Sequence, residues 1–498
     1  MNRIISKLLY ILLAIISVTN ISAQERGVTI SLNEVIEQAQ QKSVQALMAK
    51  NTYLSKYWQF RYYKAQLSPS LWLSGKLPDF GRSLSRTQDW QSGEYNYIND
   101  YQMTNYLNLY LKQNIAATGG AISLNTSLER QDQYSPDRKI NYISQPIYLR
   151  IDQPIGRFNQ LKWDKRIEPV KYEQAKFEYL ETMGKVSETA LSYFFQQLTA
   201  EQILEMARKN HTNTKSQYNT AQERFKIGAI SRNDLLQLEL NMLNTDLEIT
   251  NNEIQLNLAR ARLRTFLGYE NEETLELVIP ATVPGIKIPL DSAYNLSVNN
   301  TSFMYSYRVS QLEAEREVAR AKAEQGLQVD LSAEFGLNQY GSKIGDTYKR
   351  PTDQERVSLS LAIPILDGGM RRGKVKTALS KQEVTDAALK NDLIDRREDI
   401  FVTVLQFNNQ NNQCKISYKA DSIAQERYEL ANRQFAIGNL TVLELNAAQT
   451  DKDNARQQYV NSLKDYWDYY YKIQRITLYD FITGQNISEV FDRTDLEK

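Results

Sequence analysis

The chain of 498 residues contains two copies of one long segment, and the spacing between the copies is constant. The stretch QYNTAQERFKIGAISRNDLLQLE in the first half corresponds to RYELANRQFAIGNLTVLELNAAQ in the second half. The same offset of 210 residues relates Tyr218 to Tyr428, Phe225 to Phe435, Gly228 to Gly438 and Pro154 to Pro364. Because no insertion or deletion interrupts this stretch, we infer that each copy contains a rigid element of fixed length.

A weaker correspondence upstream places Leu32 against Leu290 at an offset of 258 residues, so the first copy carries an insertion of 48 residues. Each copy is predicted to run from a helix through a strand region into a long helical hairpin. The predicted parts are a signal peptide (1–23), a first repeat (24–267, with strands at about 67–154 and a helical hairpin at 163–267), a linker or equatorial segment (268–289), a second repeat (290–478, with strands at about 327–366 and a helical hairpin at 370–478) and a C-terminal tail (479–498).

The predicted strands are apolar on one face only. From Leu327 to Leu337 the odd positions are apolar, and the even positions are Gln, Asp, Ser, Glu and Gly. The same alternation recurs at Val357, Leu359, Leu361 and Ile363, and at Ile147, Leu149 and Ile151. Eleven residues at a rise of about 3.3 Å, tilted by about 45°, would cross a bilayer core. A soluble β-sandwich also alternates, but an uncharged apolar face beside polar helices favours a membrane β-barrel.

The insertion contains another apparent hairpin, which turns at Thr118-Gly119-Gly120. Its apolar positions are Leu107, Leu109 and Leu111 on one strand and Ile122, Leu124 and Leu128 on the other. The sequence leaves open whether this hairpin near 107–128 joins a barrel or folds outside it. The polar, tyrosine-rich stretch from Asp79 to Asn105 is predicted to be a solvated loop.

The predicted helices are too long for an ordinary globular domain. At about 1.5 Å per residue, their longer arms would span roughly 95 Å. Apolar residues such as Leu191, Phe194 and Leu198 recur at helical spacing but are diluted by polar residues. We therefore expect the arms to pack side by side with one face in water.

The turn of each hairpin carries helix-capping residues. Gly228 and Gly438 are suited to the left-handed conformation that ends a helix. Ser231 and Thr441 can cap the following helix, and Asp234 and Glu444 lie three residues later, as a capping box requires. Capping alone would explain these residues.

The composition excludes several classes of function. The formal net charge of +1 lacks the basic excess of a nucleic-acid-binding protein, and a mean hydropathy of -0.54 excludes a polytopic helical membrane protein. A single Cys414 and a single His211 provide neither a disulfide nor a Cys/His metal cluster. We predict no catalytic residue, no metal and no cofactor, and we expect Cys414 to be a packing residue.

The N-terminus is predicted to be an export signal. Arg3 and Lys7 precede an apolar run from Leu8 to Val18, and Ala23 provides a small residue at a plausible cleavage site. The mature chain would thus act outside the cytoplasm.

Three motifs together resemble the TolC-like outer-membrane efflux proteins. They are the repeated turn (FKIGAISRNDL and FAIGNLTVLEL), the segment PILDGG at Pro364–Gly369 and the segment SLNEV at Ser31–Val35. The resemblance implies a mixed α+β membrane protein: a trimeric outer-membrane β-barrel continued by a long periplasmic α-helical barrel, built from two internal repeats per chain. It also implies a passive duct whose partners are a periplasmic adaptor, an inner-membrane pump and outer-membrane lipid.

The resemblance also assigns roles to the turn residues. Asp234 and Glu444 match acidic positions near the periplasmic constriction, or gate. The segments that match the adaptor-docking tips are Ile227, Gly228, Ala229 and Ser231 in the first copy and Ile437, Gly438, Asn439 and Thr441 in the second. Leu440 and Phe435 stand where well-studied members carry an Arg and a Tyr, so a closed state held by that pair is not expected here.

Self-association is expected on physical grounds as well. Two regular strand pairs per chain cannot close a barrel, because about eight strands are the minimum. The leading hypothesis is an exit duct for small molecules or exported polypeptides. The alternative is a periplasmic coiled-coil adaptor or scaffold without its own pore, and an enzyme is a remote third possibility.

Overall fold

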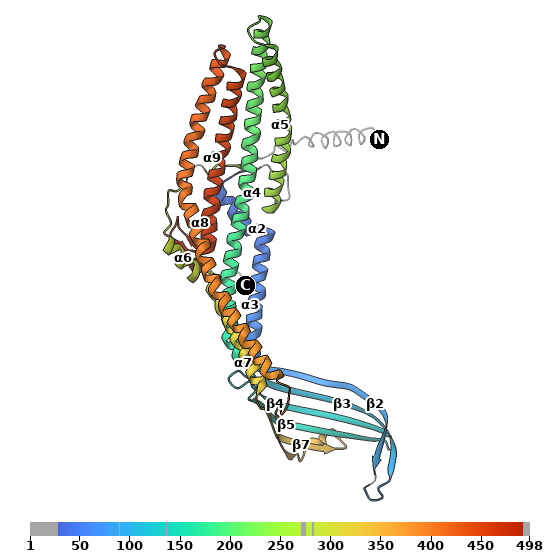
Figure 1. Ribbon diagram of the computed structural model, residues 1–498. Helices are drawn as coiled ribbons and strands as arrows, with labels where there is room; N and C mark the ends of the chain where they lie inside the picture. The colour runs from blue at the N-terminus through green and yellow to red at the C-terminus, as the bar shows by residue number, and fades with distance from the viewer. Residues whose placement is uncertain (1–27, 89, 136, 270–274, 281–282, 492–498) are drawn as a thin grey trace, which may run out of the picture.

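The computed structural model describes residues 28–88, 90–135, 137–269, 275–280 and 283–491. The predicted signal peptide lies outside the described residues, as do parts of the predicted linker and C-terminal tail. The described chain is elongated, with a helical bundle at one end and a β-sheet at the other (Figure 1). Among the described residues, no helix is long and apolar enough to cross a membrane.

The sheet contains six strands in the order β2-β3-β4-β5-β7-β8, and every neighbouring pair is antiparallel. The strands are β2 (Ser70–Gln88), β3 (Tyr95–Ile115), β4 (Gly120–Ser135), β5 (Lys139–Ile155), β7 (Gln328–Gly341) and β8 (Thr352–Ala362). The sequence left open whether the hairpin near 107–128 joins the other strands. In the structure this β3–β4 hairpin pairs with β2 on one side and with β5 on the other. It is part of the same sheet.

The prediction of a solvated loop from Asp79 to Asn105 is wrong. Strand β2 continues to Gln88 and β3 begins at Tyr95, with Gln88 opposite Tyr95 at the end of the pairing. The stretch is polar because its strands carry polar side chains beyond the apolar band, while backbone pairing and β-favouring tyrosines keep it extended.

Two helical hairpins form the other end of the molecule. They consist of α4 (Gln160–Lys226) with α5 (Arg232–Phe266), and α8 (Met370–Ala436) with α9 (Val442–Thr477). Helices α4 and α8 have the same length of 67 residues. Shorter helices flank them: α2 (Leu32–Lys42), α3 (Val44–Gln66), α6 (Leu290–Asn299) and α7 (Ser302–Gln325). Helices α3 and α7 lie beside the lower halves of α4 and α8 and lead towards the sheet (Figure 1).

Small elements complete the described chain. Strand β1 (Val28–Ile30) pairs in parallel with β6 (Leu275–Leu277), and β9 (Tyr479–Asp480) pairs with β10 (Gln485–Asn486). A 3-10 helix η1 (Ile344–Tyr348) connects β7 to β8, and α10 (Ile487–Val490) follows β10.

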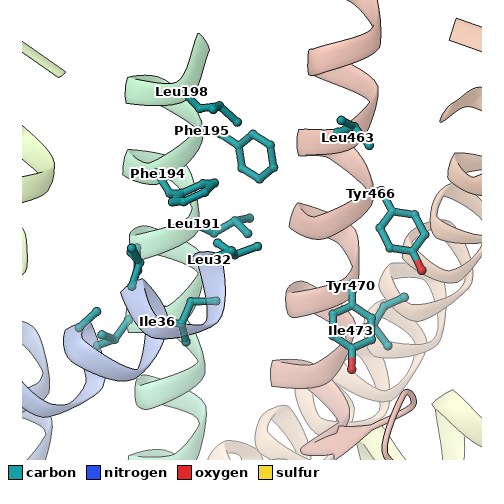
Figure 2. Close-up of a cluster of buried hydrophobic side chains, with 14 of the residues drawn as sticks. Leu32, Ile36, Leu191, Phe194, Phe195, Leu198, Leu463, Tyr466, Tyr470 and Ile473 are labelled. Atoms are coloured by element: carbon teal, nitrogen blue, oxygen red, sulfur yellow. The ribbon is translucent and has the colours of Figure 1, made fainter. Parts of the chain in front are cut away.

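The main core lies between the helices in the middle of the molecule. Figure 2 shows side chains of α4 pointing towards those of α9, with α2 packed below them. Leu191, Phe194 and Phe195 of α4 are completely buried there, and the two Phe rings meet edge to face at 5.5 Å. Cys414 belongs to the same core, and burial raises the pKa of its thiol. The expected packing role of Cys414 is thus confirmed.

Candidate functional site at the hairpin tips

The α4–α5 and α8–α9 turns lie at the same end of the molecule, farthest from the sheet (Figure 1). Beneath them, all four helices contribute to one buried cluster, which we call the tip cluster. It consists of Ala221, Leu238, Tyr428, Phe435, Val442, Leu445 and Ala448. Because this cluster joins both hairpins, the two turns are held side by side within one chain.

Each turn ends its first helix with a left-handed glycine, as predicted. Gly228 has φ 72° and Gly438 has φ 87°. The amide of Ala229 donates to the Arg224 carbonyl at 2.8 Å, and the amide of Asn439 donates to the Gln434 carbonyl at 3.0 Å. These bonds satisfy carbonyl groups at the helix ends that would otherwise lack partners.

Each second helix begins with a complete capping box. The Ser231 hydroxyl donates to Asp234 Oδ2 at 2.7 Å and accepts from the Asp234 amide at 3.1 Å. The Thr441 hydroxyl donates to Glu444 Oε2 at 2.7 Å and accepts from the Glu444 amide at 3.3 Å. The predicted capping function is therefore confirmed for both turns.

The electrostatic consequence is clear for Glu444. Hydrogen bonds from the Thr441 side chain and backbone hold the pKa of the Glu444 carboxyl below its ordinary value. Glu444 is exposed at the start of α9, where the positive end of the helix dipole also favours an anion. Within the described residues, no hydrogen bond or ion pair joins Asp234 to Glu444, since each is held within its own turn.

The exposed residues at both turns are mostly apolar or small. Ile227 and Ile437 are 79% and 70% exposed, and each precedes a glycine without a Cβ atom. Ala229 and Asn439 are exposed on the other side of the glycines. Such a surface allows another backbone to approach closely. Among the described residues, no group of His, Cys, Asp or Glu side chains could hold a metal ion.

Arg224 is a tip residue that the sequence did not single out. Its Nη1 atom donates to the Phe435 carbonyl at 3.2 Å, and its guanidinium lies 6.0 Å from the centre of the Phe435 ring. Arg224 therefore connects the end of α4 to the end of α8. The sequence does show that the two turns differ at this position, because the residue equivalent to Arg224 in the second copy is Gln434.

The two positions that depart from the family pattern are packing residues here. Phe435 is 5% exposed within the tip cluster, and Leu440 is partly buried against it. Well-studied family members carry a Tyr and an Arg at these two positions. Here both positions carry apolar side chains, which pack in or against the tip cluster.

A buried polar group lies further down the hairpins. Lys452 of α9 donates to Asn210 Oδ1 of α4 at 2.9 Å and pairs with Asp453 at 3.1 Å. Its ammonium group also lies 4.4 Å from the centre of the Tyr428 ring. Because the Lys452 charge is buried and paired, this contact fixes how α4 and α9 pack rather than offering a solvent-accessible site.

Comparisons with known proteins extend over most of the chain. The profile of the family described as "Outer membrane efflux protein" matches residues 111–269 and 296–477. Nodulation protein T of Rhizobium leguminosarum bv. trifolii is 22% identical over 280 residues, which is 55% of this chain and 59% of that protein. The chain thus covers less than two thirds of this relative.

Solved structures share the fold. The CmeC outer membrane channel of Campylobacter jejuni has a TM-score of 0.67 at 14% identity, covering 93% of this chain and 88% of that one. The outer membrane protein VceC of Vibrio cholerae has a TM-score of 0.63 at 14% identity, covering 92% and 96%. A membrane protein from Pseudomonas aeruginosa has a TM-score of 0.65 at 13% identity, covering 93% and 92%.

Proposed function

Because the chain belongs to the outer membrane efflux protein family, we propose that it is the exit duct of a tripartite efflux or type I secretion system. Proteins of this family are outer-membrane channels with a periplasmic helical extension rather than enzymes. The proposal adds that three copies form one pore, which receives small molecules or exported polypeptides from a periplasmic adaptor and an inner-membrane pump.

The proposal rests on the sheet, which is apolar on one face. Its edge strands, β2 and β8, each pair with only one neighbouring strand among the described residues. Six strands are fewer than the roughly eight that a closed barrel needs. Leu71 and Leu73 of β2 and Leu359 and Leu361 of β8 are all more than half exposed. Such an apolar, open-edged sheet is stable only if lipid covers its apolar face and further strands pair with its edges.

The helical arms support self-association independently. Helix α5 has an exposed stripe whose members are three, four or seven residues apart: Leu236, Leu240, Leu243, Leu247 and Ile254. This stripe faces away from Leu238 and Thr245, which are buried in the chain's own packing. Helix α8 carries a second exposed stripe with a spacing of seven: Ile416, Ile423 and Leu430. Heptad spacing is typical of helices that pack against other helices.

The decisive test concerns the assembly of the mature chain. We expect it to be extracted from membranes only with detergent, as a trimer by native mass spectrometry, and to conduct ions in planar bilayers. A water-soluble monomer without detergent would contradict the proposal and would favour the alternative of a periplasmic adaptor or scaffold.

Within such a trimer, we propose that Asp234 and Glu444 form acidic rings at the periplasmic constriction. The capping bonds support this role, because they hold both carboxylates in a fixed geometry, and those to Glu444 also favour its ionised form. Rings of carboxylates favour the passage of cations.

Replacing both residues, as Asp234→Asn with Glu444→Gln, should lower the cation selectivity of single channels. Glu34→Gln is a matched control, because Glu34 forms the same type of capping box with Ser31 at the start of α2, away from the tips. Unchanged selectivity in the double variant would leave only the capping role.

We further propose that the exposed tips dock the adaptor. The residues are Ile227, Gly228, Ala229 and Ser231 of the first turn and Ile437, Gly438, Asn439 and Thr441 of the second. Exposed isoleucines beside left-handed glycines support close apolar contact with another helical protein.

A further inference from the structure

The six-stranded sheet contains more strands than its repeat would give, because β3 and β4 come from the insertion in the first copy. We propose that β3 and β4 are part of the membrane wall and that β2 of one chain pairs with β8 of the next. Six strands from each of three copies would then close an eighteen-stranded barrel. This inference rests on the proposed trimeric duct and deepens it.

The apolar face continues across the inserted hairpin without a break. One row of directly opposed residues runs through five strands: Leu71, Leu111, Leu124, Leu149 and Phe335. Two residues from Phe335, Ala333 lies opposite Val357 of β8 and extends this face to the sixth strand. Since paired residues and alternate residues share one face, a lipid layer that covers β7 and β8 also covers β3 and β4.

The opposite face is polar across the same strands. On β5, Arg150 binds Asp152 at 2.9 Å and Glu334 of β7 at 3.0 Å. On the inserted hairpin, Gln131 of β4 donates to Gln102 of β3 at 2.6 Å. A polar, hydrogen-bonded face opposite an apolar one is the pattern of a wall between lipid and an aqueous lumen.

The two edges are suited to each other in direction and in charge. Strand β2 follows helix α3 and β8 precedes helix α8, so the edges of neighbouring copies would pair antiparallel with their helix ends together. The halves near the helices, 70–75 and 357–362, are uncharged. The outer half of β2 carries Lys76, Asp79, Arg82 and Arg86 and is net positive, whereas the outer half of β8 carries Asp353, Glu355 and Arg356 and is net negative. A second copy of this chain therefore fits each edge better than another partner.

The width of such a barrel also matches the helical end. At a strand spacing of about 4.8 Å and a tilt of about 40°, eighteen strands have a circumference of about 110 Å, whereas twelve strands have about 75 Å. Near the sheet each chain contributes α3, α4, α7 and α8. Twelve helices from three copies, spaced by about 8–10 Å, have a circumference of about 100–120 Å. The wider barrel continues this tunnel without narrowing, so cargo selection falls to the tips.

Cysteine labelling tests the two faces of the inserted hairpin. Cys414 is buried, so single cysteines can be added to the full chain with little background labelling. We would compare Leu109→Cys with Tyr110→Cys on β3, and Leu359→Cys with Ser360→Cys on β8, using a membrane-impermeant maleimide on outer membranes. We expect the maleimide to label Tyr110→Cys and Ser360→Cys, which face the lumen. It should not label Leu109→Cys and Leu359→Cys, which face lipid.

The β8 pair separates the inference from the proposed function. Equal labelling of the β3 pair, with a retained contrast in the β8 pair, would overturn the inference alone. Equal labelling of both pairs would overturn the membrane wall itself and the duct with it. Cryo-electron microscopy of the trimer in nanodiscs gives a second measurement: eighteen strands are expected, and twelve strands with β3 and β4 outside the wall would contradict the inference.

Discussion

At the scale of single residues, the tips depend on the capping bonds of two carboxylates and the backbone freedom of two glycines. Each carboxylate caps its own helix, because its hydrogen bonds lie within one turn. Under the proposed gate role, stability at the tip and selectivity of the pore depend on the same side chains. The carboxylates and the glycines can each be tested.

The first prediction concerns pH. The pKa of Glu444 is lowered in the folded chain, so its capping contribution is present above the ordinary carboxyl pKa and is lost as pH falls through the lower folded value. Hydrogen exchange of the first turn of α9, corrected for intrinsic rates, should therefore accelerate below about pH 4.3. Glu444→Gln should remove this dependence, while Glu34→Gln should leave α9 unchanged. A pH response that survives Glu444→Gln would contradict this prediction.

The second prediction compares the two glycines. Alanine at either position would be forced into the left-handed region, which costs about 1–2 kcal/mol. At Gly228 nothing lies within 4 Å of the new Cβ, whereas at Gly438 the Cβ would lie 2.9 Å from Arg224 Nη2. We therefore expect Gly438→Ala also to displace Arg224 from Phe435, which should speed hydrogen exchange at the end of α8.

Both glycine positions also test docking. Bulky substitutions, Gly228→Trp or Gly438→Trp, should abolish resistance to exported compounds while trimers still assemble. At Gly228 nothing lies within 4 Å of the new Cβ, so Gly228→Trp blocks the adaptor without displacing Arg224, which Gly438→Trp would also displace. Loss of assembly would show that the tips are needed for folding, and full resistance would show that they do not dock the adaptor.

At the scale of elements, the long helices are amphipathic on two sides. One side packs within the hairpin, and the other carries the exposed stripes of α5 and α8. A soluble single chain would have little reason to keep two apolar stripes in water. The exposed stripes are therefore available for contact with neighbouring copies, as the proposed trimer requires.

The third prediction addresses these stripes. Leu243→Glu places a charge in the middle of the α5 stripe and should dissociate the trimer, measured by native mass spectrometry in detergent. The helix content measured by circular dichroism should remain, because Leu243 is exposed within the single chain. Asn244→Glu is the matched control, since Asn244 is also exposed but does not belong to the stripe. Intact trimers of Leu243→Glu would exclude α5 from the interface.

At the scale of the whole molecule, the sheet and the helical tips lie at opposite ends of one elongated chain (Figure 1). The buried core between them joins α2, α4 and α9, so each end is fixed relative to the other by tightly packed side chains. The proposed membrane insertion and the proposed partner docking would thus involve opposite ends of one subunit.

The fourth prediction concerns closure between copies. Cysteines at Leu71 or Leu73 of β2, combined with one at Leu359 or Leu361 of β8, should form disulfides between subunits in at least one combination. Denaturing gels without reductant should then show covalent trimers, and each single-cysteine variant should not. If every combination stays monomeric on the gel while native trimers persist, β2 and β8 are not the joining edges.

The sequence by itself determined the local features of this protein. Strand alternation, helical periodicity and the capping residues of both turns depend on neighbours a few residues apart, and two copies of the same pattern reinforced each reading. This is why the hairpin turns at Gly228 and Gly438, and the strands around Leu331 and Leu359, could be predicted without coordinates.

Only the tertiary structure decided what depends on pairing at long range. Polar residues between Asp79 and Asn105 looked like a loop because they lack an apolar alternation, although the two arms of this stretch pair with each other from Asp79 and Thr104 to Gln88 and Tyr95. Long-range pairing explains why the sequence left the inserted hairpin unassigned and offered no reason to connect Arg224 with Phe435, 211 residues apart. Periodicity records which face of an element is apolar, but not which other element will cover it.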